Sequence, residues 1–120
     1  MSNYSRGKTA EFVARMYMRL HGYGIVAQNF TTGRGTTAGE VDFIACRAHT
    51  LVFVEVKKRK TVAEAAYAIS KQQQQRIIRG AQSFLKQNPQ YNDYDMRFDA
   101  ILVVFPWYIE HLKNAWGINF

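Results

Sequence analysis

Hydrophobic and polar positions change their spacing several times along the chain, and each change marks an expected element. Over residues 6–21 the apolar side chains recur at helical intervals, at Val13, Met16, Tyr17 and Leu20. Gly22 and Gly24 should end this helix. An apolar run over residues 25–30 then predicts a short strand, and the glycines and threonines of residues 31–39 predict a loop.

The middle of the chain shows the clearest strand pattern. Residues 39–46 and 51–57 are both rich in Val, Ile and Phe, as β-strands are. Residues 47–50 between them are too few for anything but a tight turn. The two runs therefore predict an antiparallel hairpin that turns around Ala48 and His49.

When the two strands are paired around this turn, two acidic residues occupy opposite positions on neighbouring strands. Asp42 falls opposite Glu55, and Glu40 falls opposite Lys57, with all four side chains on one face because strands alternate with period two. The other face is the expected core, formed by Val41, Phe43, Ala45, Val52, Val54 and Val56. Two carboxylates directly opposite destabilise a sheet, so a cation between them is expected, and oxygen ligands suit Mg²⁺ or Mn²⁺. The alternative is a solvated face whose acids pair with nearby Lys and Arg.

The second half of the chain predicts one long helix and one buried strand. Thr61–Glu64 reads as a capping box that should open a helix reaching about Gln87, with an apolar stripe at Ala65, Ile69, Ile77, Ala81, Phe84 and Leu85. Asn88 and Pro89 end it. Residues 98–105 are almost all apolar, which is typical of a strand buried on both faces. Residues 107–120 fit a short helix or an extended tail equally well.

The resulting element order is helix, strand, strand, strand, helix, strand, in a single domain that spans residues 1–120. The third and fourth strands are joined through the long helix, so they should be parallel with a right-handed connection. The expected fold class is therefore α/β, with a mixed sheet of order α-β-β-β-α-β flanked by helices.

Composition narrows the classes of partner. The chain has 120 residues, of which 48% are hydrophobic, enough for one domain with a real core. Its formal net charge of +7 and pI of about 9.8 favour a polyanion, most often nucleic acid, over a membrane surface. A basic protein with no polyanionic partner is the alternative.

Cysteine and histidine give no sign of a disulfide or a zinc site. Cys46 is the only cysteine, and no Cys/His cluster has the spacing of zinc ligands. The three histidines, His21, His49 and His111, are expected at the surface. Neither a signal peptide nor an apolar run of membrane-spanning length is visible, so we expect a cytoplasmic protein that makes no membrane contact.

Several short segments, taken together and in order, resemble the bacterial YraN family of small proteins. They are Gly7–Glu11, Gly39–Ile44, Leu51–Arg59, Lys71–Gln73 and Arg97–Asp99. The chain also has an acid at the start of one strand and the pattern Glu-x-Lys on the next strand. In this it resembles the PD-(D/E)xK nuclease superfamily, whose fold is called restriction-endonuclease-like. Glu-x-Lys alone occurs by chance, whereas the ordered combination is specific. The YraN family is in turn similar to archaeal Holliday junction resolvases, which share an acid in the first helix.

The resemblance implies a metal-dependent catalytic site. Asp42 and Glu55 match the acids that bind one or two Mg²⁺ or Mn²⁺ ions, and Lys57 matches the lysine that orients water or stabilises charge. Glu11 matches the acid of the first helix in resolvase-type members. The alternative for Glu11 is an ordinary solvated helix glutamate. Basic residues near the site would bind the nucleic-acid backbone without reading sequence: Arg34, Lys58, Arg59, Lys60, Lys71 and Arg76.

Three functions follow as hypotheses. The first is a metal-dependent endonuclease that hydrolyses phosphodiester bonds in branched or damaged DNA. The second is a non-catalytic nucleic-acid-binding protein that keeps the nuclease fold. The third is a scaffold whose acids only pair with Lys57 and Arg59. A monomer and a homodimer are both compatible with the sequence.

Overall fold

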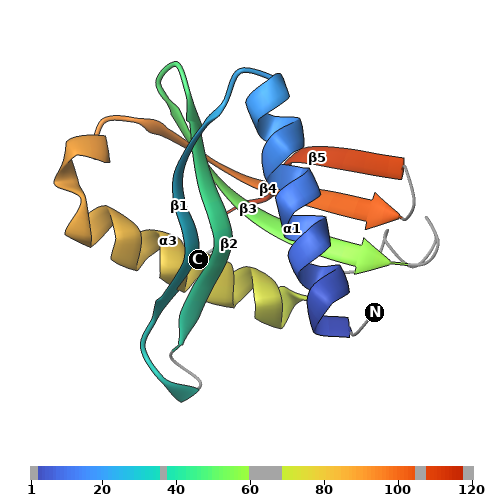
Figure 1. The fold of residues 1–120 in the computed structure, drawn as a ribbon. Coiled ribbons are helices and arrows are strands. Elements are labelled where there is room, and N and C mark those ends of the chain that lie inside the picture. Colours follow the sequence, from blue (N-terminus) through green and yellow to red (C-terminus); the bar gives the residue numbers. More distant parts are fainter. Residues whose placement is uncertain (1–2, 36–37, 60–68, 105–107, 118–120) are drawn as a thin grey trace.

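The chain forms one five-stranded sheet with a helix on each face (Figure 1). The computed structural model describes residues 3–35, 38–59, 69–104 and 108–117, without the side chains of residues 3–7 and 59. The described elements are α1 (Asn3–Leu20), β1 (Gly24–Thr32), β2 (Gly39–Arg47), β3 (Thr50–Arg59), α3 (Lys71–Gln87), the 3₁₀ turn η2 (Pro89–Tyr91), β4 (Asp95–Val104) and β5 (Tyr108–Trp116).

The strands lie in the order β1-β2-β3-β4-β5. β3 and β4 are parallel, and every other neighbouring pair is antiparallel. The mixed sheet, the order α-β-β-β-α-β and the parallel pair that joins across α3 are therefore confirmed. The chain after β4, which the sequence left open between helix and tail, adds an edge strand, β5.

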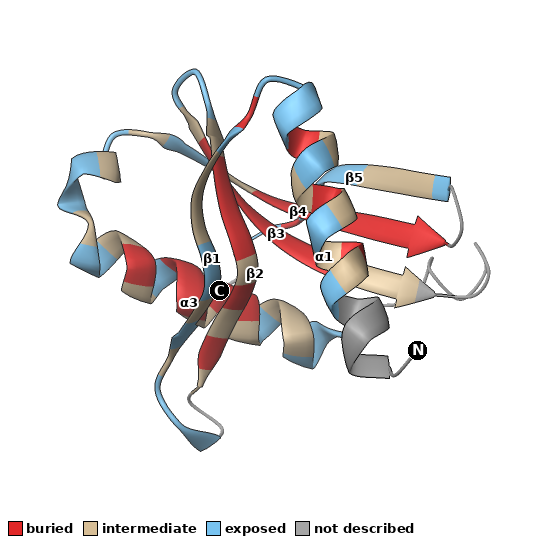
Figure 2. Cartoon of the chain, viewed as in Figure 1, coloured by how far each residue is buried: buried red, intermediate tan, exposed pale blue. Residues whose placement is uncertain are grey.

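The core has two halves, one on each side of the sheet (Figure 2). On one side α1 packs Ala10, Ala14 and Met18 against alternate residues of the sheet, among them Phe43, Ala45, Val52, Val54 and Ile101. On the other side α3 packs Ile77, Ala81 and Phe84 against the intervening residues, among them Ile44, Leu51, Phe53 and Leu102. β3 and β4 lie in the middle of the sheet, so both of their faces are buried, and this explains their nearly continuous apolar sequences.

α3 begins later than the sequence pattern predicted. Ser70 caps it with an extended backbone (φ −74°, ψ 162°), which is incompatible with a helix running through this residue from further upstream. The Gln73 N–H donates to Ser70 Oγ at 3.1 Å, and the Ser70 N–H donates to Gln73 Oε1 at 3.2 Å. This reciprocal pair is the true capping box of the helix. The predicted box at residues 61–64, the stripe residue Ala65 and the predicted strand end Phe105 lie outside the described residues.

α3 lies unusually close to the start of β2, because a glycine stands on each side of the contact. A Cβ on Gly39 would lie 2.5 Å from the Gly80 nitrogen, and a Cβ on Gly80 would lie 2.9 Å from Val41 Cγ2. Only residues without a side chain allow two backbones to approach this far. The two glycines therefore fix α3 against the part of β2 that carries Glu40 and Asp42.

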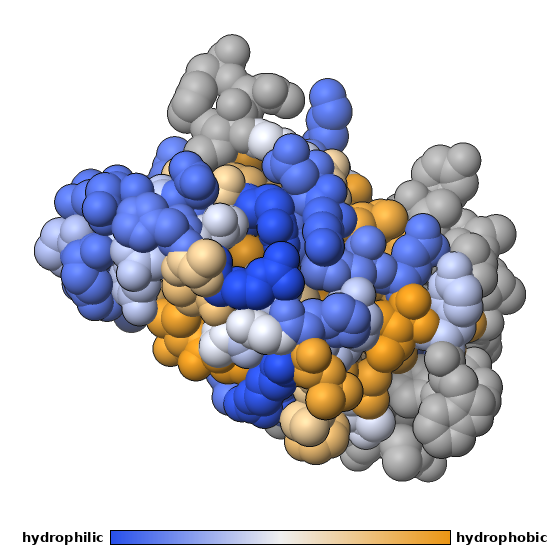
Figure 3. Space-filling view, turned by 90° about the horizontal axis from the view of Figure 1, so that it is seen from above, coloured by the Kyte–Doolittle hydropathy of each residue, from blue (hydrophilic) through white to orange (hydrophobic). Residues whose placement is uncertain are grey.

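The surface is mostly polar, with hydrophobic patches between the polar side chains on the face drawn in Figure 3. Exposed large hydrophobic residues include Phe12, Met16 and Leu20, which follow one another at intervals of four on α1. Within the described part of the chain, neither helix is both long enough and apolar enough to span a membrane.

Candidate metal site between β2 and β3

The hairpin formed by β2 and β3 has the predicted turn and register. Arg47 pairs with Thr50 and Phe43 pairs with Val54, which leaves Ala48 and His49 at the turn. The regular pairing stops at Phe43 and Val54. Beyond that point the Val56 N–H donates to Asp42 Oδ2 at 2.8 Å, so the carboxylate of Asp42 takes the place of a backbone acceptor.

Two expectations about this end of β2 are wrong. Val41 packs in the half of the core beneath α3, with Ile44, rather than beneath α1 with Phe43. The strict alternation of faces is therefore broken around Asp42, where the two strands stop pairing. Glu40 does not lie against Lys57, because its carboxylate binds Arg76 of α3 at 3.2 Å. The close glycine contact that holds α3 on β2 brings Arg76 within reach.

Glu55 and Lys57 lie beside Asp42, as the register requires. Lys57 Nζ is 3.3 Å from Glu55 Oε1, and the two side chains are only 14% and 8% exposed. Burial, and after it the charge of Asp42, together raise the pKa of Glu55 to about 8 against the opposing effect of Lys57. Glu55 therefore keeps its proton over much of the neutral range in the absence of a cation, although its distance to Lys57 is that of an ion pair.

Asp42 is only partly buried, yet its carboxyl group is desolvated as well. Desolvation raises the pKa of its carboxyl group, against the lowering effects of the Val56 amide, of a hydrogen bond with Glu55 and of Lys57. Desolvation of the two neighbouring carboxyl groups thus disfavours a negative charge on both of them at once. A divalent cation bound to both groups would favour their charged forms and offset the repulsion between them.

Glu11 of α1 lies close enough to Asp42 for the two carboxyl groups to interact electrostatically. Its Oε1 is buried and has no hydrogen-bond partner among the described residues. Burial raises the pKa of this carboxyl group, and the nearby charge of Asp42 raises it as well. An unpaired buried oxygen costs about 1–3 kcal/mol, so a water or ligand that reaches it would be stabilising. Glu11 is therefore not an ordinary solvated helix glutamate.

The arrangement fits a magnesium ion better than a metal that needs a full protein cage. Asp42 and Glu55 offer carboxylate oxygens from adjacent strands, and Mg²⁺ is commonly held by one or two carboxylates while it keeps several waters. The described residues contain no group of three or more His, Cys, Asp and Glu side chains that could surround an ion. A metal here would depend on Asp42 and Glu55, with water completing its coordination.

Comparison with known proteins gives the family. The model of the family described as "Uncharacterised protein family UPF0102" matches residues 10–103. The chain belongs to the UPF0102 family. This is the YraN family whose segments the sequence resembles.

Relatives within UPF0102 cover almost the whole chain. A UPF0102 protein of Paramagnetospirillum magneticum is 44% identical over 115 residues, which are 95% of this chain and 88% of the relative. UPF0102 proteins of Rhodopseudomonas palustris and Nitrobacter winogradskyi are 42% and 40% identical over 116 residues, which are 97% of this chain in both cases and 83% and 95% of the relatives.

The basic residues predicted to bind nucleic acid are distributed around the site formed by Asp42 and Glu55. They are not gathered within it. Arg76 touches Glu40, Lys71 is exposed in the first turn of α3, and Arg34 is exposed in the connection between β1 and β2. Lys58 is half-buried near the end of β3. The side chain of Arg59 and all of Lys60 lie outside what the structure describes.

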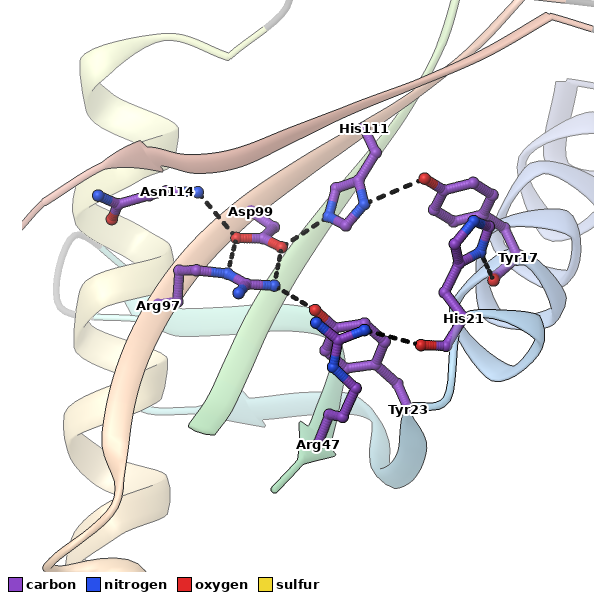
Figure 4. A network of polar contacts seen from close by, with 8 residues as sticks. All are labelled: Tyr17, His21, Tyr23, Arg47, Arg97, Asp99, His111 and Asn114. Atoms are coloured by element: carbon purple, nitrogen blue, oxygen red, sulfur yellow. Dashed lines mark hydrogen bonds and ion pairs between the residues drawn. The ribbon is translucent and has the colours of Figure 1, made fainter. Parts of the chain in front are cut away.

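A second polar cluster, which the sequence analysis did not single out, lies between β4, β5 and α1 (Figure 4). At its centre Asp99 is fully buried, and it binds both Arg97, at 2.9 Å through Nε, and His111, at 2.6 Å through Nε2. Arg97 also donates to the Tyr23 hydroxyl at 2.6 Å. The expectation that His111 is a surface residue is wrong, because its side chain is 5% exposed.

The Asp99 cluster is a structural clamp rather than a ligand site. Burial alone would raise the pKa of Asp99, but the hydrogen bonds from His111 and Arg97 and from the Asn114 backbone hold it below its usual value. Each oxygen of Asp99 already accepts two hydrogen bonds. The signal in the sequence was an arginine and an aspartate at alternate positions in the first half of β4, before its apolar run, since buried charges have to be paired.

Proposed function

We propose that this UPF0102 protein is a metal-dependent endonuclease that hydrolyses phosphodiester bonds in DNA, with Asp42 and Glu55 holding Mg²⁺ or Mn²⁺. The observation that carries this proposal is the placement of two neighbouring carboxyl groups, the partly buried Asp42 bound by the Val56 N–H and the buried Glu55 bound by Lys57. Burial of two like charges is costly unless a cation joins them. Strongly raised pKa values caused by burial and a charged neighbour also mark functional sites.

Each residue of the site has a chemical task in such a reaction. A bound ion would polarise the phosphate and lower the pKa of a water molecule. Lys57, held beside Glu55, would place an ammonium near the negative charge that develops on the phosphate oxygens. The unpaired Oε1 of Glu11 is a hydrogen-bond acceptor for the attacking water, which it would orient. Burial of the site keeps these charges effective, because little solvent screens them.

The test is cleavage by the purified protein of linear, single-stranded, flapped and four-way DNA, with Mg²⁺ or Mn²⁺. Glu55→Gln keeps the shape of the side chain but removes one anionic ligand, so we expect at least a 100-fold loss of cleavage with retained folding and DNA binding. Asp93→Asn is the matched control, because Asp93 is an exposed acid at the far end of the sheet whose partner is His49. Full cleavage by Glu55→Gln would exclude the site.

The alternative function is nucleic-acid binding without cleavage. It is favoured by the fact that the described residues hold no group of three or more His, Cys, Asp and Glu side chains that could surround a metal ion. DNA binding by a wild-type protein that cuts no substrate of the panel with either metal would select this alternative. A cytoplasmic location, and the choice between monomer and homodimer, stay predictions.

A further inference from the structure

α3 carries positive charge without any negative charge. Its 17 residues include Lys71, Arg76, Arg79 and Lys86 but no Asp or Glu. The buried residues of the helix are Ile77, Ile78, Gly80, Ala81 and Phe84. The polar positions on the other side recur at intervals of three and four, which places them in one continuous stripe along the helix: Gln72, Gln75, Arg76, Arg79, Gln82, Ser83 and Lys86.

Two adjoining hollows follow this stripe. The first has a volume of about 490 Å³ and is lined by Gly35, Gln72, Gln75, Arg76 and Arg79. The second has a volume of about 460 Å³ and is lined by Thr32, Arg79, Gln82, Ser83 and Lys86. Because Arg79 lines both, the hollows form one groove, whose opposite wall is the end of β1 and the start of its connection to β2. No acidic residue is among these lining residues.

Contacts across the groove hold its polar side chains in place. The Arg79 Nε–H donates to the Ala38 carbonyl at 3.0 Å, and Ser83 Oγ donates to Thr32 Oγ1 at 3.2 Å. Arg76 binds Glu40 at the end of the groove nearest Asp42, and its Nε is a buried donor without a partner among the described residues. The groove is thus lined by polar side chains held in place by neighbouring elements, and its Arg76 end lies at Glu40, two residues before Asp42 in β2.

We propose that the groove along α3 binds the sugar–phosphate backbone of one DNA strand next to the phosphate that reacts. The donors are guanidinium, ammonium, amide and hydroxyl groups, which is the chemistry of phosphate contacts that do not read sequence. Arg76 and Lys86 are ten residues apart, or about 15 Å along a helix. This distance corresponds to roughly four steps of 3.4 Å along the axis of a DNA duplex.

This inference rests on the proposed action on DNA, but it is tested by binding alone. We would compare two double variants that each add the same two negative charges by the same substitution. Gln75→Glu with Gln82→Glu places one charge in each hollow, on exposed helix positions. Gln28→Glu with Gln90→Glu places them on exposed positions of β1 and η2 that line neither hollow.

The measurement is the affinity for a short duplex at several salt concentrations. We expect the groove variant to bind at least 10-fold more weakly than wild type at 100 mM salt, and the control variant to bind within about 2-fold of wild type. Equal losses in both variants would show that only net charge matters, and would overturn the proposal. Unchanged binding by the groove variant would overturn it as well.

A second pair of variants keeps the test decisive if the charge insertion disturbs folding. Lys86→Gln should lower the slope of log affinity against log salt by about 0.9, the value for one phosphate contact, while Lys113→Gln on β5 should leave it unchanged. Both lysines are exposed. An unchanged slope for Lys86→Gln would contradict the groove. If the wild-type protein does not cleave DNA but the groove variant still binds DNA more weakly than wild type, the nuclease proposal is contradicted and the groove proposal is not.

Discussion

The carboxyl group of Glu55 shows how a single residue can carry the chemistry of a site. In the unfolded chain its pKa is near the ordinary value of 4.5, and in the folded protein burial and Asp42 raise it to about 8. Between about pH 4.5 and about pH 8, Glu55 therefore binds a proton in the folded state that it has released in the unfolded state. Folding stability must fall as the pH rises from about 4.5 to about 8, and it stays at the lower level above that.

Glu55→Gln should remove this pH dependence, because an amide does not titrate. With EDTA present, we expect the variant to be more stable than wild type by a few kcal/mol at pH 8 and nearly equal to it at pH 4.5. Urea denaturation at the two pH values measures the difference.

Asp93→Asn, at an exposed position, provides the baseline for this comparison. If wild type and Glu55→Gln lose stability in parallel between pH 4.5 and pH 8, the Glu55 carboxyl group is not buried as described. Added Mg²⁺ should stabilise the wild type at pH 8 but not the variant, since a ligand stabilises only the state that binds it.

At the scale of elements, the contact between α3 and β2 sets the position of Arg76 and of the groove. A glycine inside a helix is normally about 1 kcal/mol worse than alanine, so helix propensity alone predicts that Gly80→Ala stabilises the protein. The structure predicts the opposite. A Cβ at residue 80 would lie 2.9 Å from Val41 Cγ2 and 3.1 Å from the Glu40 nitrogen, and backbone cannot move aside cheaply.

We expect Gly80→Ala to destabilise the protein by about 1–3 kcal/mol, the usual cost of overpacking. Thermal unfolding measures it. Gly117→Ala is the matched control, because a Cβ at that glycine meets nothing within 4 Å. A Gly80→Ala protein at least as stable as wild type would show that α3 does not lie so close to β2.

At the scale of the whole molecule, the Asp99 clamp joins the elements that the sheet alone would leave loosely connected. The pairing of β5 with β4 is irregular between Phe98 and Ala100 of β4. At this point the Asn114 N–H of β5 donates to Asp99 at 3.0 Å. His111 of β5 bridges Asp99 and the Tyr17 hydroxyl of α1. The edge strand β5 and the helix α1 therefore share one buried anion.

Asp99→Asn should destabilise the fold by about 3–5 kcal/mol, because it removes one partner of a buried charge pair and leaves Arg97 uncompensated. Since the pKa of Asp99 is lowered in the folded state, its contribution is present at neutral pH and is lost as the pH falls below the ordinary value of 3.8. Denaturant unfolding at pH 7 measures the loss, with Asp95→Asn as the exposed control on the same strand. Equal stability of the two variants would rule out the clamp.

Local patterns made part of this structure predictable. The hairpin of β2 and β3 follows from period-two alternation on both sides of a four-residue turn, and its register follows from where the turn lies. The start of α3 was missed because two capping boxes compete in the sequence, one at residues 61–64 and one at Ser70–Gln73. β5 was left undecided because an edge strand with exposed polar residues has no strong apolar alternation.

The sequence by itself determined the order of the elements, the mixed sheet, the hairpin that brings Asp42 and Glu55 near each other, and the positive charge. These depend on neighbours within a few residues, or on the period of a strand or helix. The tertiary structure alone decided that Val41 turns toward α3, that Glu40 binds Arg76, that His111 is buried and that Glu55 holds a proton near neutral pH. The reason is physical: burial and pairing depend on side chains from distant segments, and desolvation is set by everything that surrounds a group.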